Sequence, residues 1–316
     1  MAQGDWVPDE ADQPWLPDFD VRTLVAGLPH GPVSLDDPRL AVLNDHGAPL
    51  AEIRAAMQGL GDDDPTAVWK ALTALGWRVC SDGNTAVSGA VLVPSLIRIA
   101  ADRAFAYRIG VLQLVGDLAR TDGLRMEMRP WMLRAAQPVP VYDHSGYQEN
   151  WSVDAVRVMV GRDARLLIDL LGDDDPAVRG LAAYVLVTAL PVIEELTGTL
   201  RSMLDVEGDP AVRMILVICL AQHDRELDRV PEALEWTQAL WSDAEAPLEI
   251  RLGGATAWLN LTTAAVPPQL QRLRDEVPMS DVIELARHLP WISWLTDETG
   301  GLEAWWRRQF DEARLD

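Results

Sequence analysis

Apolar residues recur every three or four positions through much of this chain, which is the spacing of one face of an α-helix. Two clear examples each precede an acidic turn. The first comprises Val156, Met159, Val160, Leu166, Leu167 and Leu170, and the second comprises Ile193, Leu196, Leu200, Met203 and Leu204. After each turn a second apolar run begins at a proline. The pattern therefore predicts pairs of amphipathic helices joined by short acidic turns.

The sequence Asp-Pro-Ala-Val-Arg occurs twice, with its prolines 34 residues apart (210 − 176 = 34). Asp175 and Asp209 fit the N-cap position, where a carboxylate accepts hydrogen bonds from free backbone amides. Pro176 and Pro210 then fit the first helical position, where a missing N–H has no consequence. A period of this length is typical of an α-solenoid, in which each hairpin buries its apolar faces against its neighbours. We therefore expect an all-α fold of stacked helical hairpins.

The repeats also share a charge pattern, in which a basic residue follows an apolar one and stands six positions after an acidic one. The copies are Asp173, Val178 and Arg179; Glu207, Val212 and Arg213; and Glu245, Ile250 and Arg251; Asp102, Tyr107 and Arg108 form a weaker copy, and Val68 with Lys70 a degenerate one. Over roughly residues 50–262 this pattern resembles the HEAT-repeat family, including its bilin-lyase-like branch. The resemblance implies a right-handed α-solenoid of HEAT-like helical hairpins, with the acid–base pairs forming a ladder between stacked repeats. The run from Trp77 to Cys80, followed by residues 90–96, is similar to bacterial members of the HEAT-like group whose function is unassigned.

Composition divides the chain into three parts. Residues 1–40 are acidic and rich in proline, and we expect a mostly irregular arm that lies on the first repeat or is loosely tethered to it. Residues 41–262 contain the HEAT-like repeats. Residues 263–316 contain Trp291, Trp294, Trp305 and Trp306 and predict a helical C-terminal cap, because a terminal repeat has one apolar face to cover.

Within the repeats, the first hairpin is expected over residues 50–60 and 65–79, with Trp77 on its apolar side. Residues 87–101 are expected to be mostly helical, and Pro94 is interpreted as the start of the helix within that stretch. The helix after that is expected to follow a cap at Asp102 and to place Ile109 inward.

Residues 121–151 interrupt the repeat, and long loops inside compact domains are usually functional or disordered. The segment combines aromatic rings and arginines, which are enriched at interface hot spots, with one imidazole. The candidate binding residues are Arg129, Trp131, Arg134, Tyr142, His144, Tyr147 and Trp151. The alternative is that their rings fix the loop to the solenoid. His144 would serve as a general base only if the loop lines a pocket.

Charge narrows the classes of partner. The formal net charge is −22 and the sequence pI is about 4.5, which disfavours binding to a phosphate backbone. The charge fits a basic partner, and the alternative is that it serves solubility alone. The acidic clusters at residues 62–64 and 173–175 are explained by helix capping without a bound metal. Cys80 and Cys219 have no zinc or disulfide spacing, and the chain shows no signal peptide or membrane span. These features predict a cytoplasmic protein.

The sequence contains none of the common nucleophile, zinc-protease, phosphate-loop or dinucleotide motifs, and no cofactor is expected. We expect a non-catalytic scaffold that binds a protein or peptide through its concave face and the 121–151 loop. One alternative is an enzyme of the helical-repeat type, lyase-like or glycosylase-like, with a pocket on the concave face. Another is an immunity or inhibitor-type protein.

Overall fold

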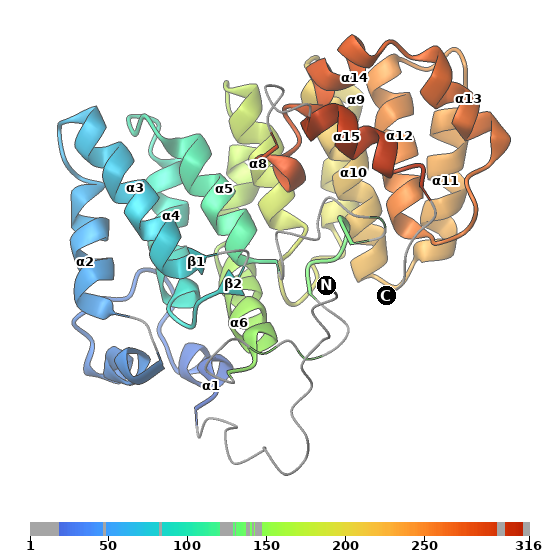
Figure 1. The fold of residues 1–316 in the computed structure, drawn as a ribbon. Helices are drawn as coiled ribbons and strands as arrows, with labels where there is room; N and C mark the ends of the chain where they lie inside the picture. The colour runs from blue at the N-terminus through green and yellow to red at the C-terminus, as the bar shows by residue number, and fades with distance from the viewer. Residues whose placement is uncertain are drawn as a thin grey trace.

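The computed structural model describes residues 19–46, 49–81, 84–120, 129, 131–136, 140, 142, 147–295 and 301–311. These residues are predominantly helical (Figure 1). The strands β1 (Cys80–Ser81) and β2 (Asn84–Thr85) form a short antiparallel pair. The prediction of an all-α protein is therefore confirmed.

The helices pack as pairs that follow one another along the chain. The pairs are α2 (Leu50–Gly59) with α3 (Pro65–Val79), α4 (Gly89–Ala101) with α5 (Arg108–Leu118), α7 (Ala164–Leu170) with α8 (Pro176–Leu186), α9 (Leu196–Val206) with α10 (Pro210–Glu226), and α11 (Val230–Ser242) with α12 (Leu248–Leu261). Helix α6 (Glu149–Arg162) precedes α7 and packs against α4. The second helices of the pairs contact one another in chain order, from α3 through α5, α8 and α10 to α12. We call the side of these five helices that is turned away from their partner helices the inner face.

The acidic turns begin helices as the sequence predicts. The side chain of Asp175 accepts a hydrogen bond from the amide of Ala177 at 2.9 Å, and that of Asp209 accepts one from Val212 at 3.0 Å. In both helices the next residue is a proline in the first turn. Capping therefore accounts for where α8 and α10 begin.

Arginine–carboxylate pairs connect successive helix pairs. Arg108 on α5 binds Asp173 before α8 at 2.6 Å, Arg179 on α8 binds Glu207 before α10 at 2.7 Å, and Arg213 on α10 binds Glu249 on α12 at 2.5 Å. The predicted ladder is confirmed for these contacts, with one correction: Arg213 pairs with Glu249, not with the Glu245 of the sequence pattern. Arg251 forms no ion pair within the described residues, and its buried Nε has no hydrogen-bond partner.

Four local predictions are wrong. Asp102 does not cap α5, which begins at Arg108 after Tyr107; Asp102 instead stands at the C-terminal end of α4. Pro94 lies inside α4, which begins five residues earlier at Gly89. Trp77 on α3 and Ile109 on α5 are 65% and 44% exposed, so neither belongs to the core. Trp77 stands two positions after the buried Leu75, and residues two apart on a helix face different directions.

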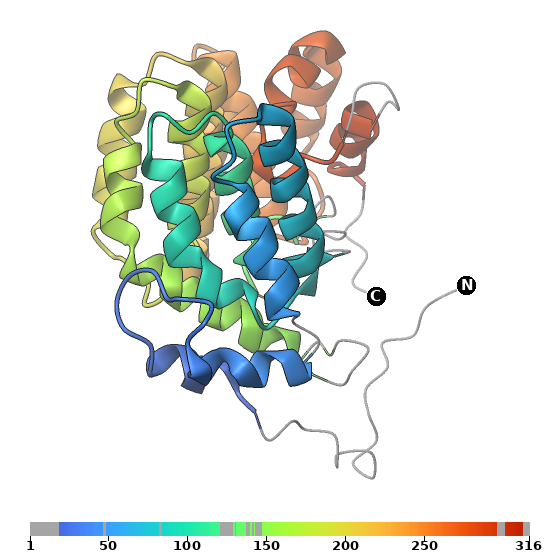
Figure 2. The same cartoon turned by 90° about the vertical axis from the view of Figure 1, so that its left-hand side faces the viewer.

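The two ends of the described chain pack on different parts of the molecule. Helix α1 (Val21–Ala26) lies on α6, rather than on the first repeat, and the 3₁₀-helix η2 (Pro38–His46) contacts α2. Helix α13 (Pro268–Glu276) contacts α11, whereas α14 (Met279–Ala286) contacts α10 and α15 (Gly301–Arg308). In Figure 2 the C-terminal helices stand on one side of the row of pairs, and α1 lies across one end of the helices.

Candidate functional site

Arg129 is a structural residue at the end of α12. Its side chain is buried, and its Nε donates a hydrogen bond to the carbonyl of Leu259 at 2.7 Å. Its Nη2 donates to the carbonyls of Thr262 at 3.0 Å and Ala264 at 2.5 Å. The guanidinium therefore satisfies free carbonyls where α12 ends, and burial lowers its pKa.

Tyr147 and Trp151 hold α1 against α6. The hydroxyl of Tyr147 accepts a hydrogen bond from the amide of Val21 at 3.2 Å, and its ring meets that of Trp151 edge-on at 5.8 Å. Arg22 lies over the Trp151 ring at 4.9 Å. Burial raises the pKa of Tyr147 to about 12.

Trp131, Arg134 and Tyr142 also make contacts among the described residues. Arg134 lies over the ring of Trp131 at 5.1 Å, and Tyr142 forms an isolated β-bridge with Gln148. His144 lies outside the described residues. The structure therefore places Arg129 against α12 and the Tyr147–Trp151 pair against α1, and it does not bring these residues together as one cluster.

The C-terminal segment covers much of the inner face. The indole of Trp291, in the 3₁₀-helix η3 (Pro290–Ile292), donates to Oε1 of Gln222 on α10 at 3.1 Å and meets the ring of Tyr184 on α8 edge-on at 4.9 Å. Gln113 on α5 donates to the carbonyl of Pro290 at 3.0 Å. Asn260 on α12 donates to Oε1 of Gln309, which follows α15, at 2.8 Å. The chain therefore fills the inner face from α5 to α12 with its own tryptophan-rich segment.

Beneath Trp291 lies a buried polar group centred on Arg120. The guanidinium lies 3.6 Å from the centre of the Tyr184 ring and donates to the carbonyls of Gly116 and Tyr184, each at 2.8 Å. Asp117 accepts hydrogen bonds from Gln113 at 2.8 Å and from the Tyr184 hydroxyl at 3.3 Å. Burial raises the pKa of Asp117 to about 6, against the opposing effects of these hydrogen bonds and of Arg120. The group connects α5, α8 and α10 with the C-terminal segment.

The remaining part of the inner face, on α3 and α5, carries exposed aromatic side chains. Trp69 and Trp77 on α3 are 55% and 65% exposed, and Ile109 on α5 is 44% exposed. Trp69 packs on the ring of Tyr107 with 6.0 Å between centroids. In Figure 1 the C-terminal helices lie in front of α10 and α12, whereas no described segment lies in front of α3. We call Trp69, Trp77, Tyr107 and Ile109 the open aromatic surface.

Carboxylates surround one end of this surface. Asp62 and Asp63 lie in the turn before α3, and Asp102 lies in the turn before α5. All three are exposed and form no ion pair within the described residues. The hydroxyl of Tyr107 donates to the carbonyl of Pro65 at 2.9 Å, which holds the two turns together beside Trp69. The sequence signal for this site is two tryptophans on a helix outside its apolar stripe.

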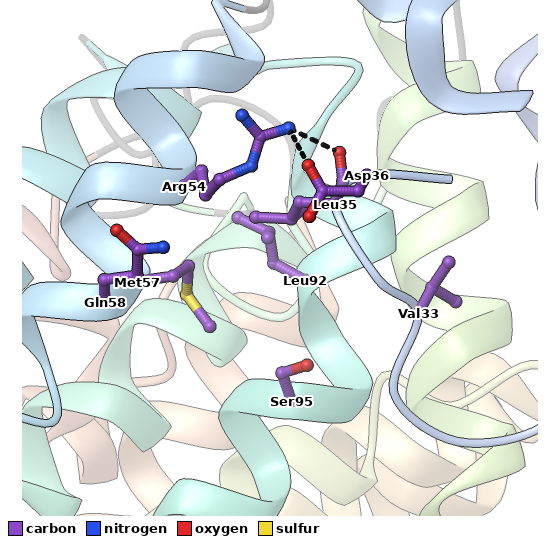
Figure 3. Close-up of a pocket in the computed structure, with 8 residues that line it drawn as sticks. All are labelled: Val33, Leu35, Asp36, Arg54, Met57, Gln58, Leu92 and Ser95. Atoms are coloured by element: carbon purple, nitrogen blue, oxygen red, sulfur yellow. Dashed lines mark hydrogen bonds and ion pairs between the residues drawn. The ribbon is translucent and has the colours of Figure 1, made fainter. Parts of the chain in front are cut away.

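A cavity of about 270 Å³ lies on another part of the molecule, between the segment before η2 and helices α2 and α4 (Figure 3). Arg54 lines this cavity, and its guanidinium donates to the carbonyl of Leu35 at 3.0 Å and forms an ion pair with Asp36 at 2.8 Å. The other lining residues are Val33, Met57, Gln58, Leu92 and Ser95. No histidine or second carboxylate stands beside the Ser95 hydroxyl among them, so the lining shows no nucleophile with its base.

Comparisons with known proteins found no matching protein-family model, no curated protein and no solved structure with significant similarity to this chain. Among the described residues, no helix has both the length and the apolar character needed to span a bilayer.

Proposed function

We propose that this protein is a non-catalytic scaffold, a right-handed α-solenoid of HEAT-like hairpins that binds a protein or peptide on its inner, concave face. The stacking of helix pairs in chain order and the arginine ladder support this arrangement. The observation that carries the function is the open aromatic surface. Tryptophan and tyrosine dominate the energetics of protein interfaces, whereas two largely exposed indoles on one helix serve no purpose in a core.

The C-terminal segment limits where such a partner binds. It already fills the inner face from α5 to α12, so the face available to a partner is that of α3 and the adjoining side of α5. The described residues of the 121–151 loop bind other parts of the chain and leave this face free.

Site-directed photo-crosslinking in cells that express the full chain tests the proposal. A benzophenone amino acid at Thr73, which lies between Trp69 and Trp77 on the exposed side of α3, is expected to capture a defined protein. The matched control places the same amino acid at the exposed Arg201 on α9, a first helix of its pair. Capture from neither position, or equal capture from both, would contradict a scaffold that binds through its inner face.

A further inference from the structure

We infer that the open aromatic surface binds an extended, basic segment of the partner, in which a lysine or arginine lies about four residues from an apolar side chain. The inference rests on the proposed function and adds the chemistry and spacing of the segment that is recognised.

The spacing of about four residues in the partner segment follows from the separation of the two exposed indoles. Trp69 and Trp77 lie two turns apart on α3, and eight residues of helix rise about 12 Å. An extended chain advances about 3.3 Å per residue, so side chains about four residues apart reach both rings. A partner segment that runs along α3 therefore presents one side chain to each indole.

The positive charge of the partner segment is inferred from the carboxylates at the end of α3 that carries Trp69. The exposed carboxylates of Asp62, Asp63 and Asp102 have no cationic partner among the described residues, because the neighbouring Arg103 is bound to Asp174 at 2.9 Å. Lys70 opposes them with a single positive charge. A cation over an indole face gains a cation–π interaction, and nearby carboxylates add Coulomb attraction.

The other end of the surface favours an apolar side chain. Arg78 beside Trp77 is bound to Glu52, so within the described part of the chain this carboxylate is paired with a cation. A Cβ atom added at Gly76, the residue before Trp77, would meet no atom within 4 Å, so a partner chain has room to approach α3 at that position. Apolar area buried in that space is removed from water without leaving a charge unpaired.

The same charges disfavour other occupants. A second copy of the chain also carries a net charge of −22 and would bring like charges together. An anionic membrane and a nucleic acid would be repelled by the carboxylates around Trp69.

The test uses the full chain labelled with 5-fluorotryptophan and observed by ¹⁹F NMR, with the two signals assigned through Trp69→Phe and Trp77→Phe. Three nine-residue peptides serve as probes. One has two lysines and, four residues on, two leucines; the second has glutamates in place of the lysines; the third has serines in place of the leucines. The lysine–leucine peptide is expected to shift both signals, with binding that weakens as salt is added.

Substitutions separate this surface from the overall charge. Asp62→Asn, Asp63→Asn and Asp102→Asn together keep the turn hydrogen bonds and are expected to weaken binding about tenfold. The control makes the same change in charge at exposed residues of α9 and α11, with Asp205→Asn, Glu232→Gln and Glu235→Gln, and is expected to leave binding within about twofold.

Several outcomes would overturn the inference. The inference is wrong if neither ¹⁹F signal moves with any peptide, or if the glutamate peptide produces equal shifts. It is also wrong if phosphatidylcholine vesicles shift the signals. Shifts that depend on protein concentration alone would indicate self-association instead. A partner captured through Thr73 whose binding is unaffected by Trp69→Phe and Trp77→Ser would also end it, while the scaffold function would stand.

Discussion

At the scale of single residues, the charge of Asp117 works against folding at neutral pH. Burial raises its pKa from 3.8 to about 6, so the folded protein binds this proton more tightly than the unfolded chain does. The contribution of Asp117 to stability therefore falls as pH rises from about 4 to about 6 and is constant above that range. Replacing the carboxylate by an amide removes this dependence and keeps an oxygen for Gln113 and Tyr184 to bind.

We expect Asp117→Asn to become more stable relative to the wild type as pH rises from 4 to 7, by at most about 3 kcal/mol. Urea unfolding of both proteins across this range measures the difference, in which the contributions of other titrating groups cancel. A difference that stays constant with pH would show that Asp117 ionises as freely in the folded protein as in the unfolded chain.

Two helical glycines should respond to alanine in opposite directions. A Cβ atom at Gly116 would lie 2.2 Å from Cε1 of Tyr184, whereas one at Gly198 would meet no atom within 4 Å. We expect Gly116→Ala to destabilise the protein by about 1–3 kcal/mol through overpacking. Gly198→Ala should stabilise it by about 0.5–1 kcal/mol, because alanine restricts the unfolded chain. Chemical denaturation measures both, and equal effects would contradict the packing around Tyr184.

At the scale of elements, the arginine ladder fixes how one helix pair sits on the next. Arg179 and Glu207 are both largely buried, and the arginine holds the pKa of Glu207 below 4.5. Removing the charge of one partner leaves the other buried without compensation. The stabilising contribution is present above the unfolded pKa of Glu207 and is lost as pH falls through its lower, folded pKa.

Glu207→Gln is expected to destabilise the protein by about 2–3 kcal/mol at pH 7. The control is Asp169→Asn, which breaks the exposed pair of Arg165 and Asp169 within α7 and should change stability by less than about 0.5 kcal/mol. Urea unfolding again provides the measurement. If both variants lose the same amount, the ladder contributes no more than a surface ion pair.

The elements that sequence predicted well are those determined by near neighbours. Asp175 and Pro176 specify the start of α8 whatever surrounds it, because a cap binds amides two or three residues away. The prediction fails for Trp77 because the position of a residue on the helix, and not its hydrophobicity, determines the side that it faces. Trp69 and Trp77 are aromatic residues on the otherwise polar side of α3, and this feature of the sequence indicates the open aromatic surface.

At the scale of the whole molecule, the C-terminal segment determines which part of the inner face is open. The sequence predicted that the C-terminal tryptophans cover an apolar face, and Trp291, Trp305 and Trp306 are fully buried. It could not predict which helices they cover, because an apolar side chain specifies burial without naming its neighbour. Gln113, Tyr184 and Gln222, which receive this segment, come from three different helix pairs.

This arrangement makes the C-terminal segment part of the core rather than a removable cover. Trp291→Ala should destabilise the protein by about 3–5 kcal/mol, because it leaves a cavity between α8 and α10 and removes the indole hydrogen bond to Gln222. The matched control is Trp294→Ala, three residues on in the same segment, where the ring is 40% exposed and the loss should be below about 1 kcal/mol. Urea unfolding and proteolysis of the segment report on both variants. If Trp291→Ala frees the segment for proteolysis while the helix pairs keep their stability, the segment is a detachable cover, and the inner face available to a partner extends from α3 to α12.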